Sequence, residues 1–258
     1  MSLNLIDAFI FGIVEGVTEF LPVSSTGHLI LTSRLLGLAQ TNFLKSFEIA
    51  IQLGAILAVV VLYGRKFLIK GEVLKKVMAA FLPTAIIGFI LYKLVKKMLL
   101  GNDQVVLWSL FLGGIFIIVF DLLHREDKNA TSEITKISYG QAMLIGLFQS
   151  IAIIPGVSRS AATIIGGLIL GINRKTIVEF SFLLAVPTMA AATALDLVKN
   201  IHAFSSDQFS FLAVGFITSF VVAIASIKFL LFFIQRFNFI FFGVYRIVLV
   251  LLFWFVVK

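Results

Sequence analysis

The sequence predicts an all-α polytopic membrane protein with two inverted-topology repeats, about six transmembrane helices and two broken re-entrant helix pairs. Three observations lead to this prediction. Hydrophobic residues make up 60% of the 258 residues and charged residues 13%, and the mean hydropathy is +1.10, which is outside the range of soluble globular domains. Apolar runs near the length of a bilayer-spanning helix recur along the chain. Two further segments are broken in the middle and resemble each other.

The predicted spans are six apolar runs rich in Phe, Leu, Ile and Val. They lack the period-two alternation of a transmembrane β-barrel, so helices are expected. The runs cover 46–64, 77–92, 105–123, 177–198, 211–234 and 239–257. The N-terminal stretch has no basic region before its apolar residues and does not resemble a cleavable signal peptide.

The remaining composition narrows the class of function. The absence of Cys excludes disulfides and thiol catalysis. The net charge of +8 comes mostly from Lys and Arg in the loops. Such loops suit membrane orientation and anionic lipid, and no nucleic-acid partner is expected.

Segments 6–36 and 140–172 do not fit simple spans, because Pro, Gly and clustered hydroxyl residues interrupt each of them. GIVEGVTEFLPVSSTGHLILTSRLLG (12–37) and GLFQSIAIIPGVSRSAATIIGGLILG (146–171) share an opening Gly, a central Pro and a Ser three residues after that Pro. Matching landmarks lie at a near-constant offset, which indicates an internal duplication. The pairs are Pro22 and Pro155, Glu48 and Glu179, and Lys93 and Lys228, with offsets of 133, 131 and 135 residues.

The duplication divides a single membrane domain into repeat one (about 1–123), a cytoplasmic loop (124–138) and repeat two (about 139–258). Loop 65–76 is strongly basic and is predicted to be cytoplasmic, whereas its counterpart 199–210 carries one Lys and one Asp. Equivalent loops on opposite sides imply inverted repeats. The two broken segments then enter from opposite sides and meet near the midplane, where unwound backbone lines a binding site.

Glu15 and Glu19 are four residues apart, so a helix places them on one face. Two carboxylates there repel each other unless a cation or a shared proton intervenes. A divalent cation, Mg²⁺ or Ca²⁺, that also contacts the substrate is the favoured partner. An acid–base pair is the alternative.

Pro22 cannot extend the preceding helix, so the chain turns at PVSSTG and restarts as a second helix near His28. Ser24, Ser25 and Thr26 lie in this turn, where hydroxyls and free backbone N–H groups face an anion. His28, three residues after Ser25, is a candidate general base or nucleophile.

The second segment repeats the turn in PGVSRSAAT. Ser158 is a candidate helix cap, Ser160 and Thr163 follow it, and Arg159 supplies a fork suited to phosphate. The alternative for each of these hydroxyls is a purely structural cap or helix-packing contact. Arg246 lies in the last apolar run and needs a partner that the sequence does not identify.

EGVTEFLPVSSTGH and PGVSRSAATI resemble the two signature motifs of the undecaprenyl-diphosphate phosphatase family of the bacitracin-resistance type. The resemblance extends over essentially the whole chain, including FEIAIQLGAILAVV. It implies a phosphatase of the bacterial inner membrane that removes one phosphate from undecaprenyl diphosphate and recycles this lipid carrier for the cell wall. It also implies that Glu15 and Glu19 act with a divalent metal, that Ser25 and His28 belong to the catalytic group, and that Ser158 and Arg159 hold the diphosphate.

The mechanism expected from these residues is in-line attack on the terminal phosphorus by Ser25 or by a water that His28 activates. A rival function is an inverted-repeat transporter or flippase for an anionic lipid or a small anion. The expected partners are a polyprenyl diphosphate and the bilayer, and a homodimer is left open.

Overall fold

The computed structural model describes residues 3–64, 71–98, 103–127, 129–200 and 208–256. Helices dominate this part of the chain, which contains an isolated β-bridge between Thr131 and Ile172 but no strand. The helices are α1 (Leu5–Thr18), α2 (Ser25–Leu35), α3 (Asn42–Tyr63), α4 (Gly71–Met98), α5 (Asp103–Leu123), η2 (Ile134–Lys136), α6 (Tyr139–Ser150), η3 (Ile151–Ile153), α7 (Arg159–Ile169), α8 (Arg174–Asn200), α9 (Phe209–Phe233) and α10 (Ile240–Val256).

Five helices of the described residues, α3, α4, α5, α8 and α9, are long and apolar enough to span a membrane. The sixth predicted span, 239–257, corresponds to α10, which is apolar but has 17 residues. The protein is therefore an all-α polytopic membrane protein.

The loop boundaries need correction. Residues 71–76, assigned to a basic loop, form the first turns of α4, because no Pro or Gly follows Gly71 until Pro83 to interrupt a helix. The rest of that loop, 65–70, and most of its predicted counterpart, 201–207, lie outside the described residues. The assignment of these two loops to opposite sides of the membrane, and the repeat boundaries, stay predictions.

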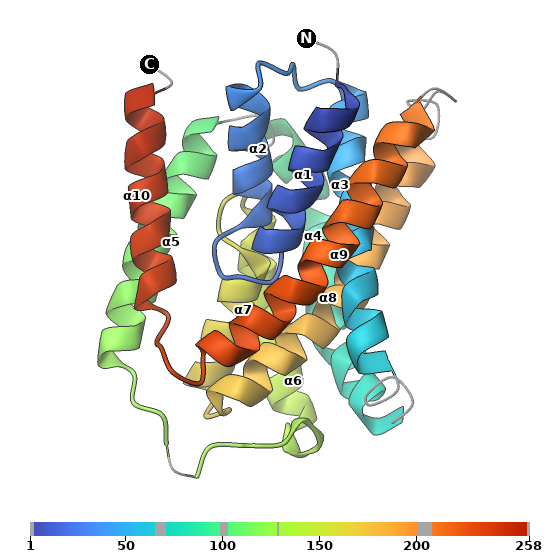
Figure 1. Cartoon of the computed structure of the whole chain (residues 1–258). Coiled ribbons are helices and arrows are strands. Elements are labelled where there is room, and N and C mark those ends of the chain that lie inside the picture. The colour runs from blue at the N-terminus through green and yellow to red at the C-terminus, as the bar shows by residue number, and fades with distance from the viewer. Residues whose placement is uncertain (1–2, 65–70, 99–102, 128, 201–207, 257–258) are drawn as a thin grey trace.

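The two broken segments form the helix pairs α1–α2 and α6–α7. The first pair extends inward from one end of the helix bundle and the second from the opposite end, so that their connecting turns lie near the middle (Figure 1). Their surroundings match as well, since α1 packs along α9 in the way that α6 packs along α4. This arrangement is that of inverted repeats.

The two connecting turns also share an unusual backbone conformation at one serine each. Ser24 and Ser158 are the only non-glycine residues of the described chain with positive φ, 71° and 82°. Each serine caps the helix that follows, because its side chain accepts the N–H of the residue three positions later. Gly37 and Gly171 end these helices with φ of 64° and 75°, which suits Gly because it lacks a Cβ.

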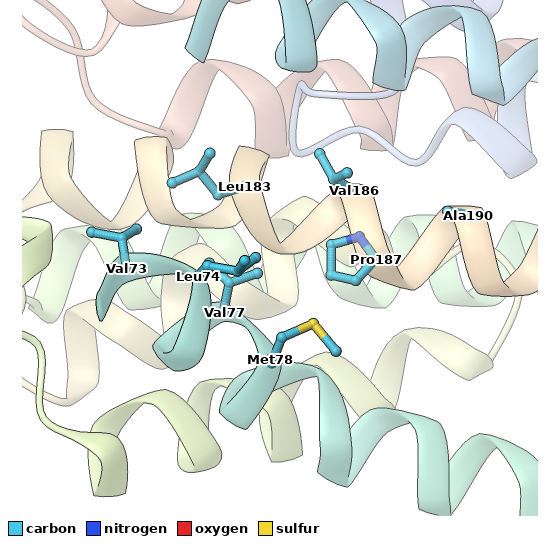
Figure 2. A pocket seen from close by; sticks show the side chains of 8 residues that line it. All are labelled: Val73, Leu74, Val77, Met78, Leu183, Val186, Pro187 and Ala190. Carbon is cyan, nitrogen blue, oxygen red and sulfur yellow. The ribbon is translucent and has the colours of Figure 1, made fainter. Parts of the chain in front are cut away.

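A cavity of about 130 Å³ separates the first turns of α4 from the middle of α8. Figure 2 shows the apolar side chains that line it, Val73, Leu74, Val77, Met78, Leu183, Val186, Pro187 and Ala190. Leu74 and Met78 are exposed, so this cleft opens toward the lipid-facing surface.

Candidate active site

The two connecting turns meet at Glu19. The Arg159 Nη2 donates to Glu19 Oε1 at 3.0 Å, and the Ser25 hydroxyl donates to Glu19 Oε2 at 2.5 Å. The Glu19 side chain is 3% exposed and that of Arg159 12%, so the charge pair is largely removed from solvent. Residues from both repeats thus form one hydrogen-bonded group, with the hydroxyl on one side of the carboxylate and the guanidinium on the other.

Arg159 also forms hydrogen bonds with a residue of the second repeat. Its Nη1 donates to the backbone oxygen of Ser181 on α8 at 2.7 Å. Its Nε is buried and has no hydrogen-bond partner in the described structure. Three of the five N–H groups of Arg159 therefore have acceptors in the described structure, two on Ser181 and one on Glu19.

A cavity of about 170 Å³ opens beside this group. Its lining residues are Glu19, Ser24, Ser25, Thr26, Gln52, Ala152, Pro155, Gly156, Ser158, Arg159, Thr188, Met189 and Ala192. Six of the ten predicted site residues are among them. The first residues of α2 and α7 border the cavity, so free N–H groups of two helix N-termini lie beside it, as an anion requires.

Ser160 and Thr163 are buried behind the cavity. The Ser160 hydroxyl donates to the Leu21 oxygen at 2.7 Å and so ties the second turn to the first. The Thr163 hydroxyl lies 2.6 Å from that of Ser181, whose backbone oxygen holds Arg159. Both residues support the site without lining it.

Glu15 is fully buried on α1, one turn before Glu19. Within the described structure neither of its carboxylate oxygens accepts a hydrogen bond from a backbone N–H, a hydroxyl or a cationic side chain. A buried carboxylate without partners is costly, so these oxygens suit a group that the protein does not itself supply. A divalent cation is such a group, because Ca²⁺ and Mg²⁺ prefer carboxylate oxygens.

The cation would need further ligands. No cluster of three His, Cys, Asp or Glu residues is found among the described residues. Glu15 and Glu19 would therefore provide the protein ligands, and substrate oxygens or water would complete the shell, as is common for Mg²⁺.

The contacts of His28 lie with the first turn and with α10. Its Nδ1 lies 2.8 Å from the Ser24 backbone oxygen, and its Nε2 lies 2.8 Å from the Tyr245 hydroxyl on α10. The two rings are stacked with centroids 5.5 Å apart. Both ring nitrogens are thus engaged, and His28 does not line the cavity with Ser25.

Several neighbours of the site were not identified from the sequence. Gln52 on α3 and Thr188 and Met189 on α8 line the cavity, and their residue types give no chemical signal. Gln149 holds α6 against two helices, because its Nε2 donates to Thr84 at 2.9 Å and to Thr188 at 3.1 Å. Its correspondence to Glu15 in the duplication was the available signal.

The partners of Arg246 are backbone oxygens. This fully buried side chain donates to carbonyls of both turns and of α5. The acceptors are Pro22, Ser109, Leu110, Gly156 and Val157.

Comparison with known proteins shows the family. A family model described as "Bacitracin resistance protein BacA" matches residues 8–252. Proteins named undecaprenyl-diphosphatase from Aquifex aeolicus and Persephonella marina are each 53% identical to this chain, over 94% and 96% of both chains. A protein of the same name from a Sulfurihydrogenibium species is 50% identical over 98% of this chain and 99% of its own. This chain therefore belongs to the BacA family of bacitracin resistance proteins.

Proposed function

We propose that this protein is an integral membrane phosphatase that hydrolyses undecaprenyl diphosphate to undecaprenyl phosphate and inorganic phosphate. The Ser25–Glu19–Arg159 group, which joins a hydroxyl, a carboxylate and a guanidinium at one cavity, is the observation that carries the proposal. The names of the relatives in the same family support this substrate.

Binding of the diphosphate rests on donors that the cavity already presents. Arg159 lines the cavity and has N–H groups without an acceptor in the described structure, and the N-terminal turns of α2 and α7 offer backbone N–H groups. Positive charge and oriented N–H groups in a water-poor site favour the charge that builds up on phosphate during transfer.

Ser25 is the favoured nucleophile. Its hydroxyl already donates to Glu19, so Glu19 accepts its proton as Ser25 Oγ forms a bond to the terminal phosphorus. The bridging P–O bond breaks, and undecaprenyl phosphate leaves. Glu19 passes its proton to the departing oxygen of undecaprenyl phosphate and then accepts a proton from a water whose oxygen attacks the phosphoserine phosphorus. The bond between Ser25 Oγ and phosphorus breaks, inorganic phosphate leaves, and Glu19 returns the proton to Ser25 Oγ. For His28 we favour a role in orienting the first turn, which the contact of its Nδ1 with the Ser24 carbonyl supports.

Glu15 and Glu19 are the residues that would hold a divalent cation, Mg²⁺ or Ca²⁺. The unpartnered oxygens of Glu15 support this assignment. Such an ion neutralises phosphate charge and helps orient the transferred group.

The isoprenoid tail requires an apolar path. The lipid-facing surfaces of the helices carry many exposed Phe, Leu and Ile side chains, and these would contact the tail. A location in the bacterial inner membrane and a role in recycling the carrier for cell-wall synthesis follow from this substrate. A homodimer stays a prediction that cross-linking in membranes tests.

Phosphate release tests the function directly. The purified protein in detergent, given a polyprenyl diphosphate and Mg²⁺, should release inorganic phosphate in proportion to enzyme. A transporter or flippase would release none, because carriage across a membrane breaks no bond. Ser25→Ala should abolish the release, while Ser33→Ala, on the same helix but away from the cavity, should retain it.

A further inference from the structure

We propose that Arg246 is a positioning residue for hydrolysis, which fixes the two connecting turns relative to each other and orients the Val157–Ser158 peptide toward the diphosphate cavity. The inference rests on the proposed function. It is carried by the hydrogen bonds of a side chain that contacts neither Glu19 nor Arg159.

The Arg246 guanidinium uses its hydrogen-bonding capacity on backbone alone. An arginine side chain has five N–H donors, and five carbonyl oxygens accept from Arg246 at distances of 2.7 to 3.4 Å. Within the described residues no carboxylate forms an ion pair with it. A fully buried arginine without a counter-ion is expensive, and such groups in a membrane are expected to serve function.

The carbonyls belong to three segments, the first turn, the second turn and α5, which meet at the guanidinium. Nη1 donates to Pro22 at 3.4 Å and to Val157 at 3.0 Å, so one nitrogen connects the first turn to the second. Nη2 reaches Gly156 of the second turn at 2.7 Å. The remaining bonds anchor the guanidinium to α5. A planar fork can hold these diverging acceptors at once, whereas an ammonium group cannot.

Both turns contain a strained residue next to these contacts. Ser24 and Ser158 have positive φ, a conformation that persists only where the surroundings enforce it. Arg246 binds the carbonyls of Val157, which precedes Ser158, and of Pro22, two residues before Ser24. It is therefore part of what enforces the conformation of both turns.

The link to the cavity is the peptide plane. In a trans peptide the carbonyl and the following N–H point in opposite directions. Because the Val157 carbonyl points at Arg246, the N–H of Ser158 points away from it, and Ser158 lines the cavity. Loss of the fork would let this peptide rotate and would move the start of α7, which carries Arg159.

The Arg246 guanidinium packs against α5 at Gly113, where no side chain stands in its way. A Cβ on Gly113 of that helix would lie 2.9 Å from the Arg246 Cζ, so an alanine there would displace the group while leaving all its donors in the chain. Gly113→Ala is therefore a second, independent way to disturb the same contacts.

The test compares Arg246→Lys, Gly113→Ala and wild type in purified form, with Arg236→Lys as the control. Arg236 is an exposed arginine stacked 4.5 Å from the Phe232 ring. The measured quantities are kcat, KM and the thermal unfolding midpoint in detergent. Wild-type phosphate release in the same assay tests the proposed function separately.

A positioning role predicts that Arg246→Lys lowers kcat about tenfold to a hundredfold, with KM within about threefold of wild type. The unfolding midpoint should stay within about 4 °C. Gly113→Ala should likewise lower kcat with little change in KM, and Arg236→Lys should match wild type in both. Normal kcat in Arg246→Lys or in folded Gly113→Ala would overturn the proposal. So would a failure of both variants to fold, because Arg246 would then be structural.

Discussion

The α1–α2 and α6–α7 pairs can be compared, because each turn ends in a capping serine of the same backbone conformation. The capping serines, Ser24 and Ser158, share a rare positive φ, and glycines with positive φ close both second helices. A non-glycine residue rarely adopts this conformation. The duplication has therefore preserved a strained turn in two copies and placed the copies opposite each other.

The side chains on the two turns differ where chemistry is expected. After each capping serine the first pair has Ser25 and the second has Arg159. Before the break, the first pair has Glu15 without partners, whereas the second has Gln149 with two hydroxyl partners. The two pairs therefore share the conformation of the capping serine but differ in charge, with the carboxylates and the candidate nucleophile in one pair and the cation in the other.

The largest expected effect comes from removing the nucleophile of the first pair. Ser25→Ala should lower kcat by about a thousandfold or more, since only binding and electrostatic assistance remain. Steady-state phosphate release measures this. Ser33→Ala should stay near wild type. If Ser25→Ala kept a substantial fraction of wild-type turnover, water would be the nucleophile.

The cation of the second pair should have the next largest effect. Arg159→Lys keeps the charge but loses the fork that contacts Glu19 and Ser181, so turnover should fall about a hundredfold with the protein folded and inserted. Arg34→Lys is the matched control, because Arg34 pairs with Asp103 at the surface. Unchanged kinetics in Arg159→Lys would reduce Arg159 to a counter-ion of Glu19.

The contrast between Glu15 and Gln149 can be tested through the metal. Chelation should abolish phosphate release, and added Mg²⁺ or Ca²⁺ should restore it. Glu15→Gln should raise the metal concentration for half-maximal activity about tenfold, because an amide is the poorer ligand. Glu72→Gln, which changes an exposed glutamate on α4, controls for lost charge. Activity that survives exhaustive chelation would refute the metal proposal and favour an acid–base pair.

The smallest effects are expected from changing the positive-φ glycine that ends the second helix of each pair. Gly37→Ala and Gly171→Ala each force a Cβ into positive φ, and no atom lies within 4 Å of the position that either Cβ would occupy. Each change should therefore cost only backbone strain, about 1 kcal/mol, or a fall of about 2–4 °C in the unfolding midpoint. Thermal unfolding in detergent measures both. Clearly unequal costs would show that the two turns are not equivalent.

Much of the fold could be predicted from the sequence. Pro22 and Pro155 break apolar segments in a way that no simple span tolerates, and the near-constant offset between landmarks indicated the duplication. The meeting of Ser25 with Arg159 followed from inverted repeats, and the structure does bring them together through Glu19.

Other features leave no trace in residue type. The acceptors of Arg246 are backbone carbonyls, which every residue carries, so its partners could not be inferred. The direction of His28 depends on the rotation of α2 and on Tyr245, which is distant in the sequence. The positive φ of Ser24 and Ser158 was equally hidden, because glycine is the residue that usually signals it.

The most direct test of the central claim, that the two repeats form one hydrolytic site, is a double-mutant cycle on kcat/KM with Glu19→Gln and Arg159→Lys. Residues that act as a unit show strongly non-additive losses. We predict that kcat/KM of the double variant is no more than about threefold below that of the less active single variant. If the two single losses instead multiplied in the double variant, Glu19 and Arg159 would act independently, and the shared site would be contradicted.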